Sequence, residues 1–410
     1  MSRHVPRPLL AGVAAALLAG PVTSTPAVAT RPVPAELPAA AVAPGCAAPP
    51  APARPVAAAP WPQDRYAPAR LSALADGSGV TVAVVDSGVD RRHPQLAGRV
   101  LDGLDLLDPG GDGTRDCVGH GTGVASVIAA APHDGVAFHG LAPNAKILPV
   151  RVSEQQVVDG QGAGRTVAAE EFATAIRWAV DNGADVINLS VVLYADRPPV
   201  RAAVAYAAAR DVVVVAAAGN LHGEGDPRPY PAAYEPVIGV GAIGADGTRA
   251  GFSQTGPYVD LVAPGTDVLI AAPGRGHQRA EGTSYAAPFV AATAALVRQY
   301  RPDLSATEVT RRILATADPA PGEGYGVGVL NPYRAVTEEV GTTPRARPAG
   351  GLDVERPDPA RAAQESRRSA VRERAALFTA AGLLAVTVVV LAAVLVPQGV
   401  RRRWRPAEPR

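Results

Sequence analysis

Short apolar runs rich in β-branched residues recur through the middle of the chain, and longer segments with a helical pattern of apolar positions separate them. Runs of this composition are typical of strands buried on both faces of a parallel sheet. They lie at residues 80–86, 145–151, 185–190, 212–217 and 237–242. The helical patterns lie at residues 118–130, 168–182, 200–210 and 285–300. This alternation predicts an α/β fold in which helices cover both faces of a parallel sheet.

Polar residues stand where three of the predicted strands end. Asp86 closes the first run, Ser190 closes the third, and Asn220 follows the fourth. Functional groups in such sheets gather at the carboxyl ends of the strands. The sequence therefore predicts a functional site along this edge.

Both ends of the chain depart from the globular pattern. Residues 1–29 have a polar start, an apolar stretch at residues 9–19 and small residues before their end, which is typical of a cleaved signal peptide. Residues 375–396 carry no charge and could span a bilayer, and residues 397–410 form a basic tail. We expect the body of the protein outside the cytoplasm, one transmembrane helix and a cytoplasmic tail. A buried core helix is the alternative for the apolar segment, although such a helix normally shows a polar stripe.

Two Pro-rich segments lie on either side of the globular part of the chain. Residues 30–60, rich in Pro and Ala, form an N-terminal extension that should run extended over a surface. Residues 341–374 are polar and typical of a flexible linker. The globular domain is therefore expected at residues 61–340.

Charge and cysteine content narrow the class of protein. The 410 residues carry 39 Lys and Arg against 38 Asp and Glu, which excludes a strongly basic nucleic-acid-binding surface. The two cysteines, Cys46 and Cys117, favour a disulfide in an exported chain, with two free thiols as the alternative. The disulfide would close a loop of roughly 70 residues, worth ~4 kcal/mol in the loop-entropy model. Residues 110–116 lack the bidentate Glu of a calcium loop, so we expect no metal site and no cofactor.

Three short motifs each hold one residue of an Asp, His and Ser set. Asp86 lies in VAVVDSGVD at a predicted strand end, and His120 in GHGTGVAS and Ser284 in GTSYAAP each open a helical pattern. Taken singly, each residue has an ordinary structural use, such as a strand-end turn or a helix N-cap. Together they can supply an orienting acid, a base and a nucleophile. Unpaired backbone N–H groups at the start of the helix that Ser284 opens can help to hold an oxyanion.

A fourth motif, AAAGN, ends in Asn220, whose side-chain amide can also donate to a developing oxyanion. The remaining histidines lack a comparable setting. We assign His93 to a structural turn, and the others to loops: His133, His139, His222 and His277.

The motifs VAVVDSGVD, GHGTGVAS, AAAGN and GTSYAAP, in this order, resemble those of the subtilisin-like (subtilase) serine proteases. More narrowly, the chain resembles the mycosins, membrane-anchored subtilases associated with type VII secretion in actinobacteria. That narrower likeness depends on the signal peptide, the extension that carries Cys46, the Asp-Cys pair ahead of Gly-His-Gly-Thr, and the C-terminal span with its basic tail.

The resemblance implies a subtilisin-like domain and an acyl-enzyme mechanism. It implies the triad Asp86, His120 and Ser284, the oxyanion donor Asn220, and the substrate-binding residues Ser190, Val191 and Gly219. It also implies exported protein substrates, contact with subunits of a type VII secretion membrane complex, and a cell-membrane location with the catalytic domain on the extracytoplasmic side.

One departure from the family pattern bears on the substrates. Val191 and Val192 follow Ser190 where many secreted subtilases have a Gly-rich strand, so we expect a narrowed cleft and a restricted set of substrates. General protein turnover is disfavoured for this reason and by the membrane tether. A structural role in the secretion complex, with proteolysis secondary, is the other hypothesis. We further expect the extension at residues 30–60 to wrap the protease domain, held by the Cys46–Cys117 bridge.

Overall fold

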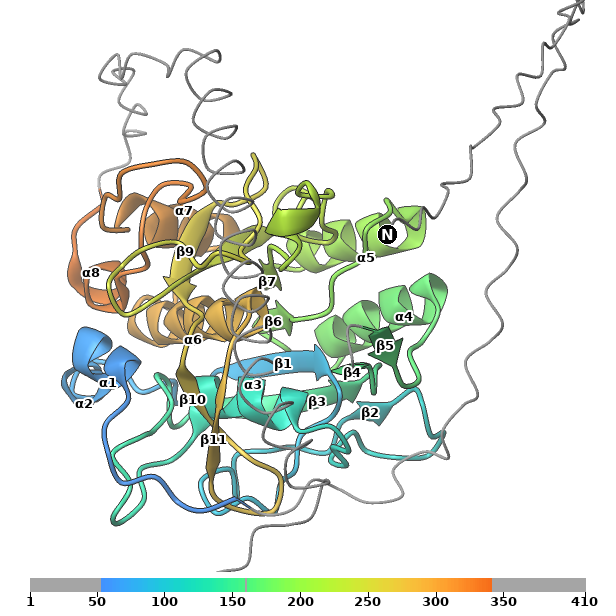
Figure 1. Ribbon diagram of the computed structural model, residues 1–410, viewed down its shortest axis with the longest axis horizontal. Coiled ribbons are helices and arrows are strands. Elements are labelled where there is room, and N and C mark those ends of the chain that lie inside the picture. The colour runs from blue at the N-terminus through green and yellow to red at the C-terminus, as the bar shows by residue number, and fades with distance from the viewer. Residues whose placement is uncertain (1–52, 159–160, 341–410) are drawn as a thin grey trace, which may run out of the picture. The chain divides into compact units, whose positions relative to one another are not determined.

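A seven-stranded sheet forms the centre of the structure, a computed structural model that describes residues 53–158 and 161–340 (Figure 1). The strands are β1 (Thr81–Asp86), β2 (Leu104–Asp105), β3 (Lys146–Arg151), β6 (Val186–Leu189), β7 (Val213–Ala217), β8 (Ile238–Ile243) and β9 (Leu261–Pro264). They pair in the order β2-β3-β1-β6-β7-β8-β9, and every pairing is parallel. The predicted runs coincide with β1, β3, β6, β7 and β8, so the α/β prediction is confirmed.

Helices cover both faces of the sheet, as predicted. Along β1, Val82 and Val84 point into one core and Ala83 and Val85 into the other, because successive side chains of a strand face opposite ways. The first face is covered by α3 (His120–Ala129) and α6 (Thr283–Tyr300), and the second by α4 (Ala169–Asp181) and α5 (Pro198–Ala209) (Figure 1). The amino ends of α3 and α6 therefore meet the carboxyl ends of the central strands.

Shorter elements surround this core. They are α1 (Trp61–Tyr66), α2 (Pro68–Ser72), the 3-10 helix η1 (His222–Glu224), α7 (Ala306–Ala315), α8 (Pro332–Thr337), and the hairpins of β4 (Gln156–Val158) with β5 (Gln161–Ala163) and of β10 (Val268–Ala271) with β11 (His277–Ala280). His277 therefore begins a strand and His222 a 3-10 helix, so the prediction that both lie in loops is wrong. The strand β11 is polar in sequence and gains its conformation by pairing with β10, which explains why no apolar run signals it.

The described end of the N-terminal extension runs beside β11. The backbone N–H of Ala53 donates to the Arg275 carbonyl at 3.0 Å, and that of His277 donates to the Arg54 carbonyl at 3.1 Å. The side chain of Val56 packs on the small core around Phe138. Over residues 53–56, then, the extension lies against the globular domain.

Several predictions concern residues outside the described part of the chain. They are the signal peptide (1–29), the extension as far as residue 52 with Cys46, the linker (341–374), the transmembrane segment (375–396) and the tail (397–410). Within residues 53–158 and 161–340, no helix is both long and apolar enough to cross a membrane. These assignments therefore stay predictions.

Candidate active site

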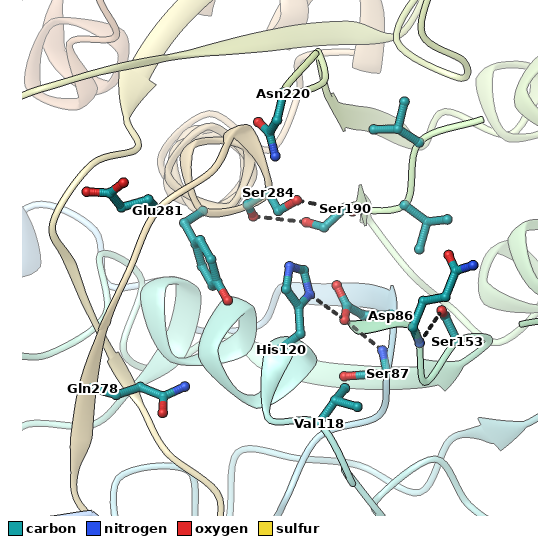
Figure 2. A pocket seen from close by; sticks show the side chains of 14 residues that line it. Asp86, Ser87, Val118, His120, Ser153, Ser190, Asn220, Gln278, Glu281 and Ser284 are labelled. Atoms are coloured by element: carbon teal, nitrogen blue, oxygen red, sulfur yellow. Dashed lines mark hydrogen bonds and ion pairs between the residues drawn. The ribbon is translucent and has the colours of Figure 1, made fainter. Parts of the chain in front are cut away.

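Asp86 and His120 form a hydrogen-bonded pair at the carboxyl edge of the sheet. Asp86 ends β1 and is 2% exposed, and His120 is the first residue of α3. Oδ1 of Asp86 lies 2.7 Å from Nδ1 of His120 (Figure 2). The two segments can approach because Gly121 has no side chain: a Cβ there would lie 2.1 Å from the Gly88 carbonyl oxygen. Since Asp86 engages Nδ1, Nε2 is left as the nitrogen that can accept a proton.

A buried carboxylate that the sequence reasoning missed, Asp116, holds the start of α3. One oxygen accepts from Ser87 Oγ at 2.9 Å and from the Gly119 N–H at 2.8 Å. The other accepts from the N–H of Thr122 at 2.8 Å and from its hydroxyl at 2.5 Å. Asp116 thus ties the turn after β1 to the first turn of α3, the two segments that carry the Asp–His pair. Its position just before Cys-Val-Gly-His was the available signal.

The environment of His120 favours its protonated form. Burial of the ring lowers its pKa, but the charge and hydrogen bond of Asp86 and the charge of Asp116 outweigh burial, so the pKa is raised above its ordinary value. The ring also packs on Tyr285, with 5.1 Å between centroids. Burial raises the pKa of the Tyr285 phenol, which keeps it neutral. The raised pKa means that the Asp86 and Asp116 carboxylates stabilise the imidazolium that would form if His120 accepted a proton.

Ser284 is the second residue of α6 and lines the same cavity (Figure 2). Its Oγ donates to the backbone carbonyl of Ser190 at 3.3 Å, and the Ser190 hydroxyl donates to the Ser284 carbonyl at 3.0 Å. In the part of the chain that the structure describes, no hydrogen bond joins Ser284 to His120. Proton transfer between them therefore requires the Ser284 side chain to leave the Ser190 carbonyl and turn toward the ring.

Asn220 lies just after β7, with its side-chain amide held in one orientation. Its Oδ1 accepts from both the N–H and the hydroxyl of Thr283, each at 2.9 Å, and the Thr283 hydroxyl accepts from the Gly219 N–H at 3.1 Å. Thr283 thereby occupies the amide oxygen, and Nδ2 is turned toward Ser284 (Figure 2). The backbone N–H of Ser284 has no partner among the described residues. These two donors can hold an oxyanion.

These side chains open into one cavity of about 450 Å³. Ser190, Val191 and Val192 line one side of it, and neither valine makes a backbone hydrogen bond within the described residues. Further lining residues that the sequence reasoning missed are Ser87, Val118, Ser153, Gln155, Gln278, Glu281 and Tyr285. Gly219, predicted to bind substrate, is buried beside Asn220 and is not among the lining residues.

Two other sequence expectations concern cysteine and metal. Cys117 is not a free thiol in the structure, but Cys46 lies outside the described residues, so their pairing stays a prediction. No cluster of His, Cys, Asp or Glu that could hold a metal ion occurs within residues 53–158 and 161–340.

The fold and the site define the chain as a serine endopeptidase of the subtilisin type. The model of the subtilase family, Peptidase_S8, matches residues 77–329, and the chain belongs to this family.

Its relatives include a thermophilic serine proteinase and proteases of the mycosin group. The thermophilic serine proteinase of Bacillus sp. (strain AK1) is 39% identical over 280 residues, which span 67% of this chain and 66% of that protein. Mycosin-1 of Mycobacterium tuberculosis (strain ATCC 25618 / H37Rv) is 35% identical over 340 residues, which span 70% of this chain and 75% of that protein. The solved structure of the serine protease MycP1, an essential component of the type VII (ESX-1) secretion system, matches with a TM-score of 0.59 and 34% identity over 68% of this chain and 89% of that one. The chain is thus a mycosin-like subtilase.

Proposed function

We propose that the chain is a membrane-anchored, extracytoplasmic serine endopeptidase associated with type VII secretion, with Asp86, His120 and Ser284 as its catalytic triad. The observation that carries the proposal is the 2.7 Å bond from Asp86 to His120 in a cavity that Ser284 also lines, with the Asn220 amide turned toward it.

In the proposed reaction, Ser284 Oγ attacks the carbonyl carbon of the scissile peptide bond while Nε2 of His120 takes the hydroxyl proton. Asp86 orients the ring and stabilises the imidazolium. Nδ2 of Asn220 and the N–H of Ser284 hold the oxyanion. His120 then gives the proton to the leaving amine, and the acyl group stays on Ser284 until water releases it by the reverse sequence.

The cellular setting is inferred from two sources. The apolar segments at residues 9–19 and 375–396 support export and membrane anchoring. The likeness to MycP1 supports association with a type VII secretion complex and exported proteins as substrates. The branched side chains of Val191 and Val192 on the cavity wall support a restricted set of these substrates, since pocket shape governs specificity.

A second candidate is a structural subunit of the secretion complex, with proteolysis secondary. It is favoured by one specific observation, that MycP1 is an essential component of its secretion system. A folded domain can serve such a role whether or not Ser284 reacts.

Complementation of a deletion strain separates the two candidates. The strain receives the wild-type chain, Ser284→Ala, or Asn220→Ala as a second variant altered at the site, and both secretion and processing of exported proteins are measured. The proposal predicts that Ser284→Ala abolishes processing of a few exported proteins. The structural subunit would instead be favoured if Ser284→Ala restored secretion and every exported protein had the same mass as in the strain with the wild-type chain.

A further inference from the structure

Glu281 is an acidic side chain on the wall of the active-site cavity. It stands three residues before Ser284, in the short connection between β11 and α6, and is exposed. Within the described residues it forms no hydrogen bond and no ion pair. A carboxylate in this position meets any peptide that occupies the cavity.

The other ionisable groups that line the cavity are already engaged or uncharged. Asp86 and His120 bond to each other at 2.7 Å, and burial raises the pKa of the Tyr285 phenol and keeps it neutral. The nearby Arg279 pairs with Asp267 at 2.7 Å and does not line the cavity. Among the described residues, Glu281 is therefore the charge that a bound peptide can pair with.

The position of Glu281 relative to Ser190 indicates which half of a peptide it meets. The Ser190 carbonyl is 3.3 Å from Ser284 Oγ, within reach of the N–H of the residue whose carbonyl is attacked. The open backbone of Val191 and Val192 can pair with the preceding residues of an extended peptide. Glu281 lies across Ser284 from Ser190 (Figure 2). The acyl half thus lies along residues 190–192, and the leaving half continues toward Glu281.

We propose that Glu281 selects a basic residue, Lys or Arg, at the first or second position after the scissile bond. The inference rests on the proposed acyl transfer at Ser284 and adds a substrate class to it: peptides that are basic on the leaving side. The Glu281 carboxylate attracts a cationic side chain of the peptide and repels an Asp or Glu at the same position.

The test uses the full-length protein and a peptide library of varied sequence, with the new chain ends identified by mass spectrometry. Four proteins are compared: the wild type, Glu281→Gln, Glu281→Arg, and Glu323→Gln, which removes an exposed carboxylate away from the cavity. The readout is the ratio of cleavage rates for peptides with Lys or Arg to peptides with Asp or Glu at those two positions. This ratio does not depend on the amount of active enzyme.

We expect a ratio of about ten in the wild type and in Glu323→Gln. The ratio should be near one in Glu281→Gln and below one in Glu281→Arg. Added salt should lower the wild-type ratio, because it screens the charges. A wild-type ratio near one, an unchanged ratio in Glu281→Gln, or a charge preference confined to the acyl side overturns the assignment of Glu281.

Failure of the proposed function has a different signature. Cleavage of peptides that are neutral on the leaving side does not depend on the charge of Glu281. If the protein fails to cleave these peptides, the proposed reaction at Ser284 is contradicted. The dissociation constants of the same basic and acidic peptides for Ser284→Ala then measure the charge ratio without turnover. Equal constants overturn the Glu281 assignment, and about tenfold tighter binding of basic peptides supports it.

Discussion

Thr283 fixes the side-chain amide of Asn220 through its own N–H and hydroxyl, so the proposed oxyanion donor depends on a residue that is buried and does not line the cavity. Asn220→Ala should lower kcat by about 10²–10³, the loss that follows removal of such a donor in subtilisin, a member of the same family. Thr283→Val keeps the shape but loses the hydroxyl, and should lower kcat by about tenfold with little change in KM. Steady-state kinetics on a peptide substrate measure both effects.

Thr283→Ser is the matched control because it retains the hydroxyl and should keep most of the activity. Equal kcat values for Thr283→Val and Thr283→Ser would show that the hydroxyl does not orient the amide.

The raised pKa of His120 sets the pH dependence of the reaction. In the proposed reaction the neutral ring is the base, and the pKa of His120 is raised above the ordinary 6.5 by the charge and hydrogen bond of Asp86. The acid limb of kcat/KM should therefore reach half its maximum above pH 6.5. Asn220→Ala serves as the control, because it should lower the rate at every pH without moving the limb. A midpoint at or below 6.5 would contradict the environment described for His120.

At the residue scale, local motifs predicted the side chains that meet at the cavity but not the residues that hold them in place. Asp86, His120 and Ser284 each lie in a motif at an element end, and their predicted positions converge on one cavity. Thr283 and Asp116 were missed because each acts through a contact between segments that are distant in the sequence. Thr283 joins α6 to the loop after β7, and Asp116 joins the loop before α3 to the turn after β1.

At the scale of elements, the contact between the extension and β11 depends on an uncharged histidine. Nδ1 of His277 accepts the N–H of Val56 at 3.1 Å, and Nε2 lies 2.6 Å from Oε1, the side-chain amide oxygen of Gln95. Burial, together with the charges of His93 and His133, lowers the pKa of His277 to about 4. The unfolded ring binds a proton near pH 6.5 and the folded ring near pH 4, so stability is full above pH 6.5 and declines as the pH falls toward 4.

Residues 53–56 should therefore loosen from β11 across this pH window. Hydrogen exchange, corrected for its intrinsic pH dependence, should show falling protection of the Ala53 and Val56 amides between about pH 6.5 and pH 4. His277→Gln offers both an acceptor and a donor without titrating, and should keep protection constant. Protection in the wild type that does not change with pH would contradict the role of His277.

The elements also differ in how well the sequence reveals them. Each parallel strand that the sequence predicted is a run of β-branched or small residues with both faces buried, as in β1 and β7. By contrast, β11 is polar and β2 is very short, and both exist because a neighbouring strand supplies their hydrogen bonds. Pattern alone cannot indicate such a partner.

At the scale of the whole molecule, the predicted Cys46–Cys117 bridge would join the N-terminal extension to the loop that precedes His120. Such a bridge should stabilise the fold by ~4 kcal/mol, since it closes a long loop in the unfolded chain. A reductant should therefore lower the Tm by several degrees. Cys46→Ser and the double variant should both lower the Tm, because each removes the bond. A Cys46→Ser variant as stable as the wild type, or free thiols in the native protein by mass spectrometry, would exclude the pairing.

The proposed role of Ser284 can be tested by reaction of the full-length protein with a fluorophosphonate probe, because the probe modifies only a serine activated by a neighbouring base. We predict a single adduct on Ser284 in the wild type, none in Ser284→Ala, and strongly reduced labelling in His120→Ala. Absence of labelling in the folded wild-type protein, or an adduct on a serine other than Ser284, would contradict this role.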